Sequence, residues 1–300
     1  MKQSTNHGMR LSRRHIMAAG LTTALLGRSR MAAAAAPFDP NDPASVLRTA
    51  FRMRGIEDGR ITMGWLKARR FGVVDAEITP LFGMVTGTFG RYRILDDGSI
   101  VNASFELAFY TDLETGDVLE TFTMPYTGKT VSVPRLMLGP SKGTTRPVFH
   151  ELIETGYDAE RTESETAMRP VGSTRFERWL GPVTVKDDNI WITQASSATL
   201  IPADPNANKV VYSESVTSQA DYADAINPNL VTIPSALSYT GITSWRPWME
   251  MEDHSGHTTS HGFGGKTFDV DGLPDDYRAM AERYYPDAIA NPGAVLDELD

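Results

Sequence analysis

Between residues 83 and 138, apolar and polar side chains alternate as they do on β-strands. The alternation is clearest at 99–111, where Phe105, Leu107 and Phe109 are interleaved with more polar residues. Successive side chains on a strand point to opposite faces of a sheet, so one face of this segment belongs to a core and the other to a wetter environment. We therefore expect Phe105 to be buried and Glu106 to tolerate substitution.

The same alternation continues along most of the chain and predicts a mainly β protein. Turns rich in Asp, Gly and Pro separate a first antiparallel meander, with strands at 83–95, 99–111, 118–124 and 131–138. Residues 139–175 are polar and punctuated by Gly and Pro, which predicts a long excursion between two sheets. The strand pattern then resumes at 179–185, 190–201, 210–216, 235–251 and 258–268.

Only two helices are predicted. Asp42 and Pro43 supply an N-cap and a first-turn proline for a helix at 44–54, and a second helix spans 275–285 before Pro286. Many short strands with few helices between them favour an antiparallel barrel, similar to lipocalins and other calycins, or a sandwich, with a few flanking helices.

The N-terminal residues have the layout of an export signal. The pair Arg13-Arg14 precedes a short apolar run at 17–26 and small residues at 32–36. The run is too short to span a bilayer. We expect residues 1–35 to be a twin-arginine signal peptide, recognised by the twin-arginine export machinery, and residues 36–300 to form a single β-rich domain in the periplasm.

Composition and charge exclude several function classes. The 300 residues are 41% hydrophobic and 22% charged, which is typical of a soluble globular protein. The formal net charge is −9, and residues 1–36 hold basic residues but no acid, so the remaining chain is more acidic still. Such a surface repels nucleic acid and anionic lipid, and we expect neither nucleic-acid binding nor stable membrane insertion.

The absence of cysteine removes further chemistry. With no Cys in the chain, disulfides, thiolate metal sites and a cysteine nucleophile are excluded. The sequence also has no glycine-rich dinucleotide motif, phosphate loop or nucleophile elbow. It therefore identifies no cofactor.

A polar cluster at 250–261 holds the first group of candidate site residues. Its histidines His254, His257 and His261 are candidate metal ligands, and His261, His257 and Glu250 are candidate catalytic residues. On a strand, residues four apart face the same way, so His257 and His261 could converge. The alternative is that these histidines occupy exposed loop and strand positions, because no constrained metal-binding spacing is present.

A second group is aromatic. Trp245, Arg246 and Trp248 surround Pro247, which cannot donate to a sheet ladder and predicts a sheet edge or bulge. Two indoles and a guanidinium suit a pocket wall that stacks a ring and binds an oxygen. The alternative is that both tryptophans plug a core. Weaker inward-facing candidates are Arg175, Arg178, Glu214 and His150.

Three segments carry a family resemblance. Residues 109–119, 125–128 and 243–251 resemble a bacterial family known only as domain of unknown function 1838. The resemblance extends over about 44–292 and implies an exported protein, since family members often begin with an export signal. It implies no activity.

Together these features predict an exported periplasmic protein that binds a small, largely apolar or aromatic molecule in a β-barrel pocket, and either transforms or only carries it. One alternative is a metal-dependent hydrolase or lyase that uses the histidines and carboxylates of 250–261. Another is an envelope interaction protein without a small ligand, which would show a flat apolar patch.

Overall fold

One antiparallel sheet of ten strands dominates the computed structural model, which describes residues 38–156, 172–202, 209–251 and 254–297. The strand order is β6-β3-β2-β1-β12-β11-β10-β9-β8-β7, and β4 and β5 form a separate small sheet. The strands are β1 Thr62–Val74, β2 Glu77–Ile94, β3 Ile100–Thr111, β4 Thr121–Thr123, β5 Thr130–Ser132, β6 Leu136–Thr145, β7 His150–Gly156, β8 Gly172–Lys186, β9 Asn189–Pro202, β10 Val210–Asp221, β11 Ala236–Thr243 and β12 His257–Thr267. The expected signal peptide lies outside the described residues.

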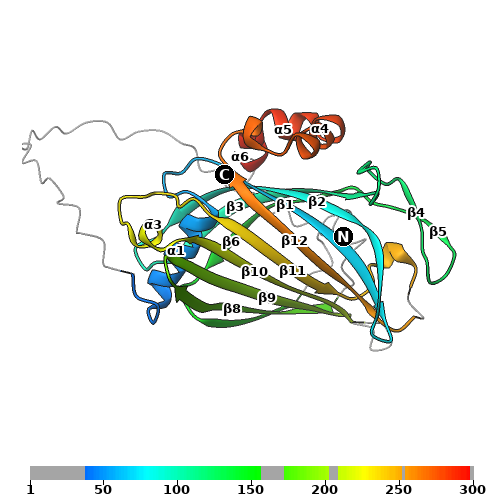
Figure 1. The fold of residues 1–300 in the computed structure, drawn as a ribbon, viewed down its shortest axis with the longest axis horizontal. Coiled ribbons are helices and arrows are strands. Elements are labelled where there is room, and N and C mark those ends of the chain that lie inside the picture. Colours follow the sequence, from blue (N-terminus) through cyan, green and yellow to red (C-terminus); the bar gives the residue numbers. More distant parts are fainter. Residues whose placement is uncertain (1–37, 157–171, 203–208, 252–253, 298–300) are drawn as a thin grey trace, which may run out of the picture. The chain divides into compact units, whose positions relative to one another are not determined.

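The large sheet is strongly curled. Side chains from β6, β3, β2, β1, β12, β11, β10 and β9 all line one cavity together with helix α1 (Pro43–Arg54), which a flat sheet could not achieve. The strands run obliquely across the molecule in Figure 1. We call the face that lines this cavity the concave face and the opposite face the convex face.

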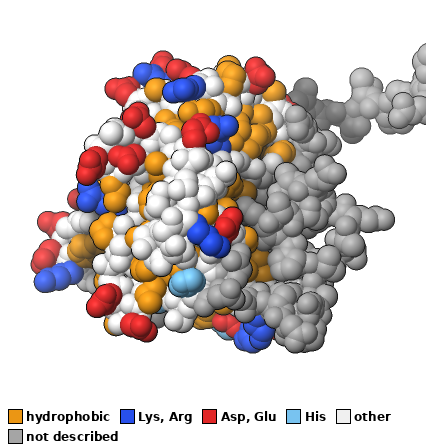
Figure 2. Space-filling view, turned by 90° about the vertical axis from the view of Figure 1, so that its right-hand side faces the viewer, with side chains coloured by type: hydrophobic (Ala, Val, Ile, Leu, Met, Phe, Trp, Pro, Cys, Tyr) orange, Lys and Arg blue, Asp and Glu red, His pale blue; other side chains and the backbone are white. Residues whose placement is uncertain are grey.

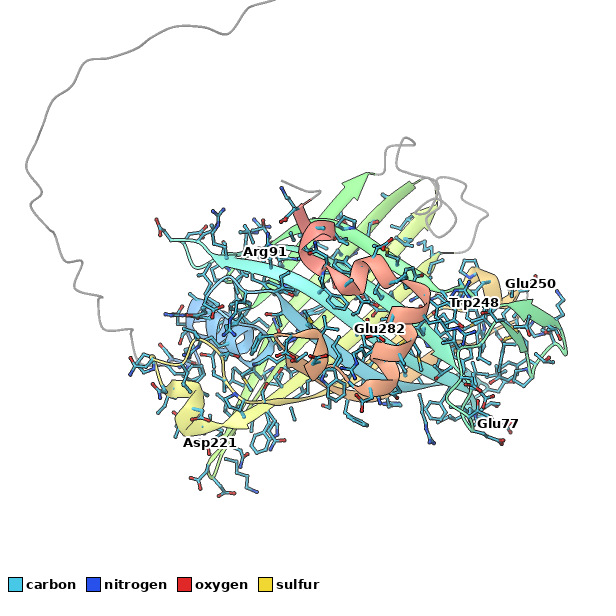
Figure 3. The ribbon with its side chains drawn as sticks, turned by 90° about the horizontal axis from the view of Figure 1, so that it is seen from above. Glu77, Arg91, Asp221, Trp248, Glu250 and Glu282 are labelled. Atoms are coloured by element: carbon cyan, nitrogen blue, oxygen red, sulfur yellow. The ribbon has the colours of Figure 1, made fainter. Side chains whose placement is uncertain are left out.

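The convex face of β1, β2 and β3 is covered by the C-terminal helices, which lie above the sheet in Figures 1 and 3. They are α4 Asp275–Tyr284, α5 Pro286–Ala290 and α6 Pro292–Asp297, preceded by the short turn η2 Val270–Gly272. Phe105, Leu107 and Phe109 pack in one apolar cluster with Tyr277 of α4. Gly87 makes this approach possible, because a Cβ there would lie 2.1 Å from the Tyr277 hydroxyl.

Apolar clusters close the concave side at its two ends. At one end α1 packs with α3 (Tyr222–Ile226) against Ile100, Ile190 and Ile192. At the other end the β4–β5 sheet and the turn η1 (Pro247–Met249) pack against Phe82 and Tyr110. Figure 2 views the molecule from this second end, where apolar side chains emerge among charged ones.

Helix α1 forms as expected. Asp42 caps its first turn by accepting from the backbone N–H groups of Ala44 and Ser45, and Pro43 occupies the first turn. Arg52, near its end, donates to the carbonyls of Ala225, Asn227 and Leu230 and so ties α1 to the chain after β10.

The mainly β prediction is confirmed, but two of its details are wrong. The described parts of 139–175 do not link two sheets, because β6 continues to Thr145, β7 follows, and β8 begins at Gly172, all in the same sheet. The expected meander is also divided: β6 pairs with β3, whereas β4 and β5 pair only with each other. Within the described parts of the chain, no helix is both long and apolar enough to cross a membrane.

Candidate functional site

A band of charged and phenolic side chains crosses the concave face between the two apolar ends. Side chains an even number of residues apart on a strand point to the same face of the sheet. Each strand residue of this band either lines the cavity or lies an even number of residues from one that does, which places it on the concave face. The band consists of Arg70 on β1, Glu106 on β3, Tyr212 and Glu214 on β10, and Tyr239 on β11. Arg246, between β11 and η1, joins them by lying over the Tyr212 ring.

Glu106 contributes a carboxyl group to the cavity wall. Thr88, its partner on β2, donates to Oε2 at 3.5 Å. Burial, reinforced by the negative charge of Glu214, raises the pKa of Glu106 to about 7, while Thr88 and Arg246 act in the opposite direction. The carboxyl group therefore changes its charge near neutral pH, which is the property that general acid–base chemistry requires.

Tyr212, Glu214 and Tyr239 form a hydrogen-bonded group beside Glu106. The Tyr212 hydroxyl donates to Glu214 Oε2 and lies 3.3 Å from the Tyr239 hydroxyl, and Ser196 donates to Glu214 Oε1 at 3.3 Å. Gly241 leaves room for this contact, because a Cβ there would lie 2.4 Å from the Tyr239 hydroxyl. Burial raises the pKa of both phenols, so both hydroxyls stay protonated, and Tyr212 uses its proton in the bond to Glu214.

Arg70 is the most deeply buried cation of the band, with 2% of its surface exposed. Its Nε donates to Ser260 at 3.0 Å, and Nη2 lies 3.6 Å from the sulfur of Met84. Burial lowers its pKa, and Arg246 contributes in the same direction. The β1–β2 register shifts directly after Arg70, a bulge of the kind that redirects side chains near binding sites.

Glu106 and Tyr239 of this band line the cavity, which reaches α1 and has a volume of about 280 Å³. Apolar groups from α1, β10 and β11 share its wall with hydroxyl, amide and carboxyl groups. These include Phe51, Leu66, Thr86, Thr88, Glu106, Gln194, Val216, Leu237, Tyr239 and Lys266. A pocket of this kind suits a small molecule with an apolar body and a few polar atoms.

Lys266 lies in the cavity wall but is committed to structure. Its Nζ donates to the carbonyl oxygens of Arg52, Met53 and Ile233, each at 2.7 Å. These three bonds use all three donors of the ammonium group and satisfy carbonyls at the end of α1. Burial lowers the pKa of Lys266 to about 7. We therefore regard Lys266 as a clamp on α1 and not as a nucleophile.

Trp245, Arg246 and Trp248 contact different side chains. Trp248 packs against the rings of Phe82 and Tyr110 and closes the end of the interior, as a core plug does. Trp245 contacts the Tyr126 ring, and its buried Nε1 has no hydrogen-bond partner among the described residues. Pro247 begins the turn η1 and not a bulged strand edge. Only Arg246 joins the polar band.

The histidine cluster does not reach the cavity. His257 and His261 belong to β12, where His261 is opposite Arg69 on the convex face, in contact with the Phe71 ring. Four residues of strand separate their α-carbons by about 13 Å. Glu250 is exposed and pairs with Lys129 at 3.5 Å, and His254 is exposed; Figure 3 places Glu250 beyond Trp248 at the outer end.

Within the described ranges, no three His, Asp or Glu side chains gather as a metal site would require; Glu252 and Asp253 lie outside these ranges. Metal binding by His254, His257 and His261 stays a prediction.

The weaker candidates have different fates. Glu214 lies in the polar band. Arg178 instead pairs with the buried Glu151, which also binds Arg146, and His150 stacks on Trp179. Arg175 is exposed and pairs with Glu177.

Sequence reasoning missed Arg70, Glu106, Tyr212 and Tyr239. The sequence signal that could have identified them is their position on the more polar face of strands whose other face is apolar.

Comparison with known proteins gives one family match. Residues 208–299 match the family described as "Protein of unknown function (DUF1838)". The resemblance to that family is confirmed over this part, which contains 243–251, whereas 109–119 and 125–128 precede it. No curated protein matches the chain.

The similarity of this chain to solved structures is weak. Two variants of the Rh. blastica porin each align with 69% of this chain and 100% of their own, at 7% identity, with TM-scores of 0.21 and 0.22. These scores are too low to indicate a shared fold.

Proposed function

We propose that this chain is an exported periplasmic protein that binds a small, largely apolar or aromatic molecule inside its curled sheet. We further propose that the sheet is an open antiparallel barrel of the lipocalin type, whose two edge strands, β6 and β7, are joined by the short link 146–149. The observation that carries the proposal is the cavity of about 280 Å³, walled by eight of the ten strands and by α1.

The wall composition supports this choice over the alternatives. Phe51, Leu66, Val216 and Leu237 supply apolar surface, and Glu106 and Tyr239 supply polar atoms at one side of the same cavity. A binding cavity of this composition requires no metal, and His257 and His261, two of the three candidate ligands, lie on the convex face. An interaction protein would instead present a flat apolar surface as its site.

Filling the cavity tests the binding function. Native mass spectrometry of protein purified from its own periplasm should show a bound small molecule in the wild type. Leu237→Trp, which fills the cavity, should lose it, because an indole occupies the space of the ligand. Ser238→Trp is the matched control, since Ser238 is the exposed neighbour on the opposite face and the variant should retain the molecule. Equal retention by both variants would contradict the proposal.

Export is tested separately. Changing Arg13 and Arg14 together to Lys should leave the precursor in the cytoplasm, because the exporter recognises the arginine pair as an address and not as a charge total. Periplasmic accumulation of the double variant at the wild-type level would remove the twin-arginine assignment.

A second candidate function is acid–base catalysis on the bound molecule, with Glu106 as the proton-transferring group. It is favoured by the position of this carboxyl group in the cavity wall beside Glu214, where its pKa is raised to about 7. Carboxyl ¹³C NMR should find this pKa in the wild type and a lower one in Glu214→Gln. An ordinary glutamate pKa for Glu106 would remove the candidate.

A further inference from the structure

Two arginines reach the polar band with donors that none of the described residues satisfies. Nη1 of Arg70 and Nε of Arg246 are both buried and have no hydrogen-bond partner. Among the parts of the chain that are described, no carboxylate lies within ion-pair distance of either side chain. A buried guanidinium group without a counterion, such as that of Arg70, is costly, so its presence calls for an explanation.

The nearby carboxylates do not supply that counterion. Glu214 accepts from Tyr212 and Ser196, so its two oxygens are already engaged. Glu106 accepts only from Thr88, and its raised pKa of about 7 shows that its surroundings disfavour the charged form. Arg246 does lower the pKa of Glu106, but burial and Glu214 raise it more, so Arg246 does not hold Glu106 in its charged form.

Phenol side chains and a second cation also surround Arg70. Tyr110, Tyr212 and Tyr239 all act on its charge, as does the second cation, Arg246. Tyr212 and Tyr239 are held with their hydroxyls 3.3 Å apart, and Arg246 lies over the Tyr212 ring at 5.4 Å from its centroid. Because Tyr212 donates to Glu214, the donors of this group that lack an acceptor among the described residues are Nη1 of Arg70 and Nε of Arg246.

We propose that Arg70 and Arg246, with the hydroxyl of Tyr239, form a subsite for a carboxylate, and that the molecule bound in the cavity, which Tyr239 also lines, is a small carboxylic acid with an apolar body. The inference rests on the proposed binding function and names its ligand class. A carboxylate matches the guanidinium fork in shape and charge. A phosphate dianion is disfavoured, because Glu106 and Glu214 lie beside the subsite and would repel the second charge.

Three probes of one shape test the ligand class. Isothermal titration calorimetry of the full mature chain would compare 3-phenylpropanoate with 3-phenylpropanamide and 3-phenylpropan-1-ol. We expect the wild type to bind the acid about tenfold or more tightly than the amide or the alcohol, because a charge-assisted hydrogen bond contributes more than a neutral one. Phenylethyl phosphate should bind more weakly than the acid.

The variants localise the effect. Arg70→Met should abolish the preference for the acid while the alcohol still binds. Arg69→Met is the matched control, because Arg69 is the adjacent arginine on the exposed convex face, and it should keep the full preference. The wild-type comparison of probes stands even if Arg70→Met fails to fold.

A readout without ligand separates a binding role from a structural one. In the ligand-free protein, Arg70→Met should raise Tm by a few degrees, because an apolar side chain replaces a buried, partly unsatisfied charge. Arg69→Met should leave Tm unchanged. A fall in Tm combined with an unchanged acid preference would make Arg70 a structural residue and overturn the proposal.

The remaining outcomes distinguish failure of the carboxylate subsite from failure of the binding function. If acid, amide and alcohol bind the wild type equally well, the carboxylate subsite is overturned and the binding function stands. Tighter binding of the phosphate than of the acid would overturn the assignment to carboxylates in favour of dianions. If none of the four probes binds, the result counts against the proposed function and against this inference with it.

Discussion

The two faces of strands β1, β2 and β3 differ in what their side chains are used for. On the convex face, Phe105, Leu107 and Phe109 pack beneath the C-terminal helices in a dry apolar cluster. On the concave face of the same strands lie Arg70 and Glu106, two charged groups with incomplete partners. Stability therefore comes chiefly from the convex packing, whereas the concave band costs stability and points to function.

The largest loss of stability is expected from a charge placed on the convex face. Phe105→Asp puts an unpaired carboxylate where Phe105 is 2% exposed and stacks on Phe89. We expect a loss of several kcal/mol, on the order of the stability of a whole domain, and therefore no soluble folded protein. Circular dichroism and urea unfolding provide the measurement, with Phe105→Leu as a mild control. A folded Phe105→Asp protein of normal stability would contradict the account of this face.

Removing the α1 clamp should have the next largest effect. Lys266→Met loses three hydrogen bonds to backbone carbonyls and should lower the free energy of unfolding by about 2–4 kcal/mol. Lys67→Met, on the convex face of β1, loses only an exposed ion pair with Asp276 and should cost about 1 kcal/mol or less. Urea unfolding compares the two variants, and equal losses would remove the structural role of Lys266.

Glu106 gives a prediction with a defined pH window. Its pKa is raised from 4.5 to about 7, so the folded state binds this proton more tightly than the unfolded state does. The stabilisation of the folded state by this protonated carboxyl group is fully present below about pH 4.5 and is lost as pH rises to about 7. Each unit of pKa difference corresponds to about 1.4 kcal/mol in the free energy of unfolding.

The neutral isostere should remove that dependence. Glu106→Gln should be more stable than the wild type at pH 8, by up to about 3 kcal/mol, and close to it at pH 4.5. The exposed Glu77→Gln serves as control. Thermal unfolding from pH 4 to pH 8 measures the difference, and parallel profiles for Glu106→Gln and wild type would show that Glu106 is not perturbed.

The smallest effects are expected at the histidines. His261 is exposed, and its ring centroid lies 6.3 Å from that of Phe71, so His261→Ala should change the free energy of unfolding by about 1 kcal/mol or less. His257→Ala should behave similarly, and neither should alter binding in the cavity. Zinc, manganese and iron analysis accompanies the unfolding curves. Stoichiometric metal in the wild type that is lost in either variant would restore the metal-dependent alternative.

Much of the architecture could be predicted from local patterns. The alternation at 99–111 identifies β3, and the capping signal at Asp42 identifies α1, because both signals are contained within a few adjacent residues. Strand β1 escaped prediction, since its mixed sequence, with Lys67, Arg69 and Arg70 among apolar residues, does not alternate cleanly. Its place at the centre of the sheet depends on pairing with β12, far away in sequence.

The site was harder to predict for the same reason. Alternation shows that Glu106 faces away from Phe105, but it does not show that this second face is covered as well. Because curling of the sheet turns the wetter face into an interior, we now expect substitutions of Glu106 to change stability. Of the candidates at 245–248, Arg246 lies over the Tyr212 ring of the polar band, whereas Trp248 packs against Phe82.

Methyl NMR tests the central claim most directly, because it reports on both faces of the sheet in one experiment. With Ile, Leu and Val methyl groups labelled, 3-phenylpropanoate should shift the signals of Leu66, Val216 and Leu237, which line the cavity. Val85 and Leu107, packed on the convex face, should keep theirs. Saturable shifts confined to the cavity methyls are the result this account predicts. Shifts confined to Val85 and Leu107, or to exposed methyls such as Ile242, would contradict it.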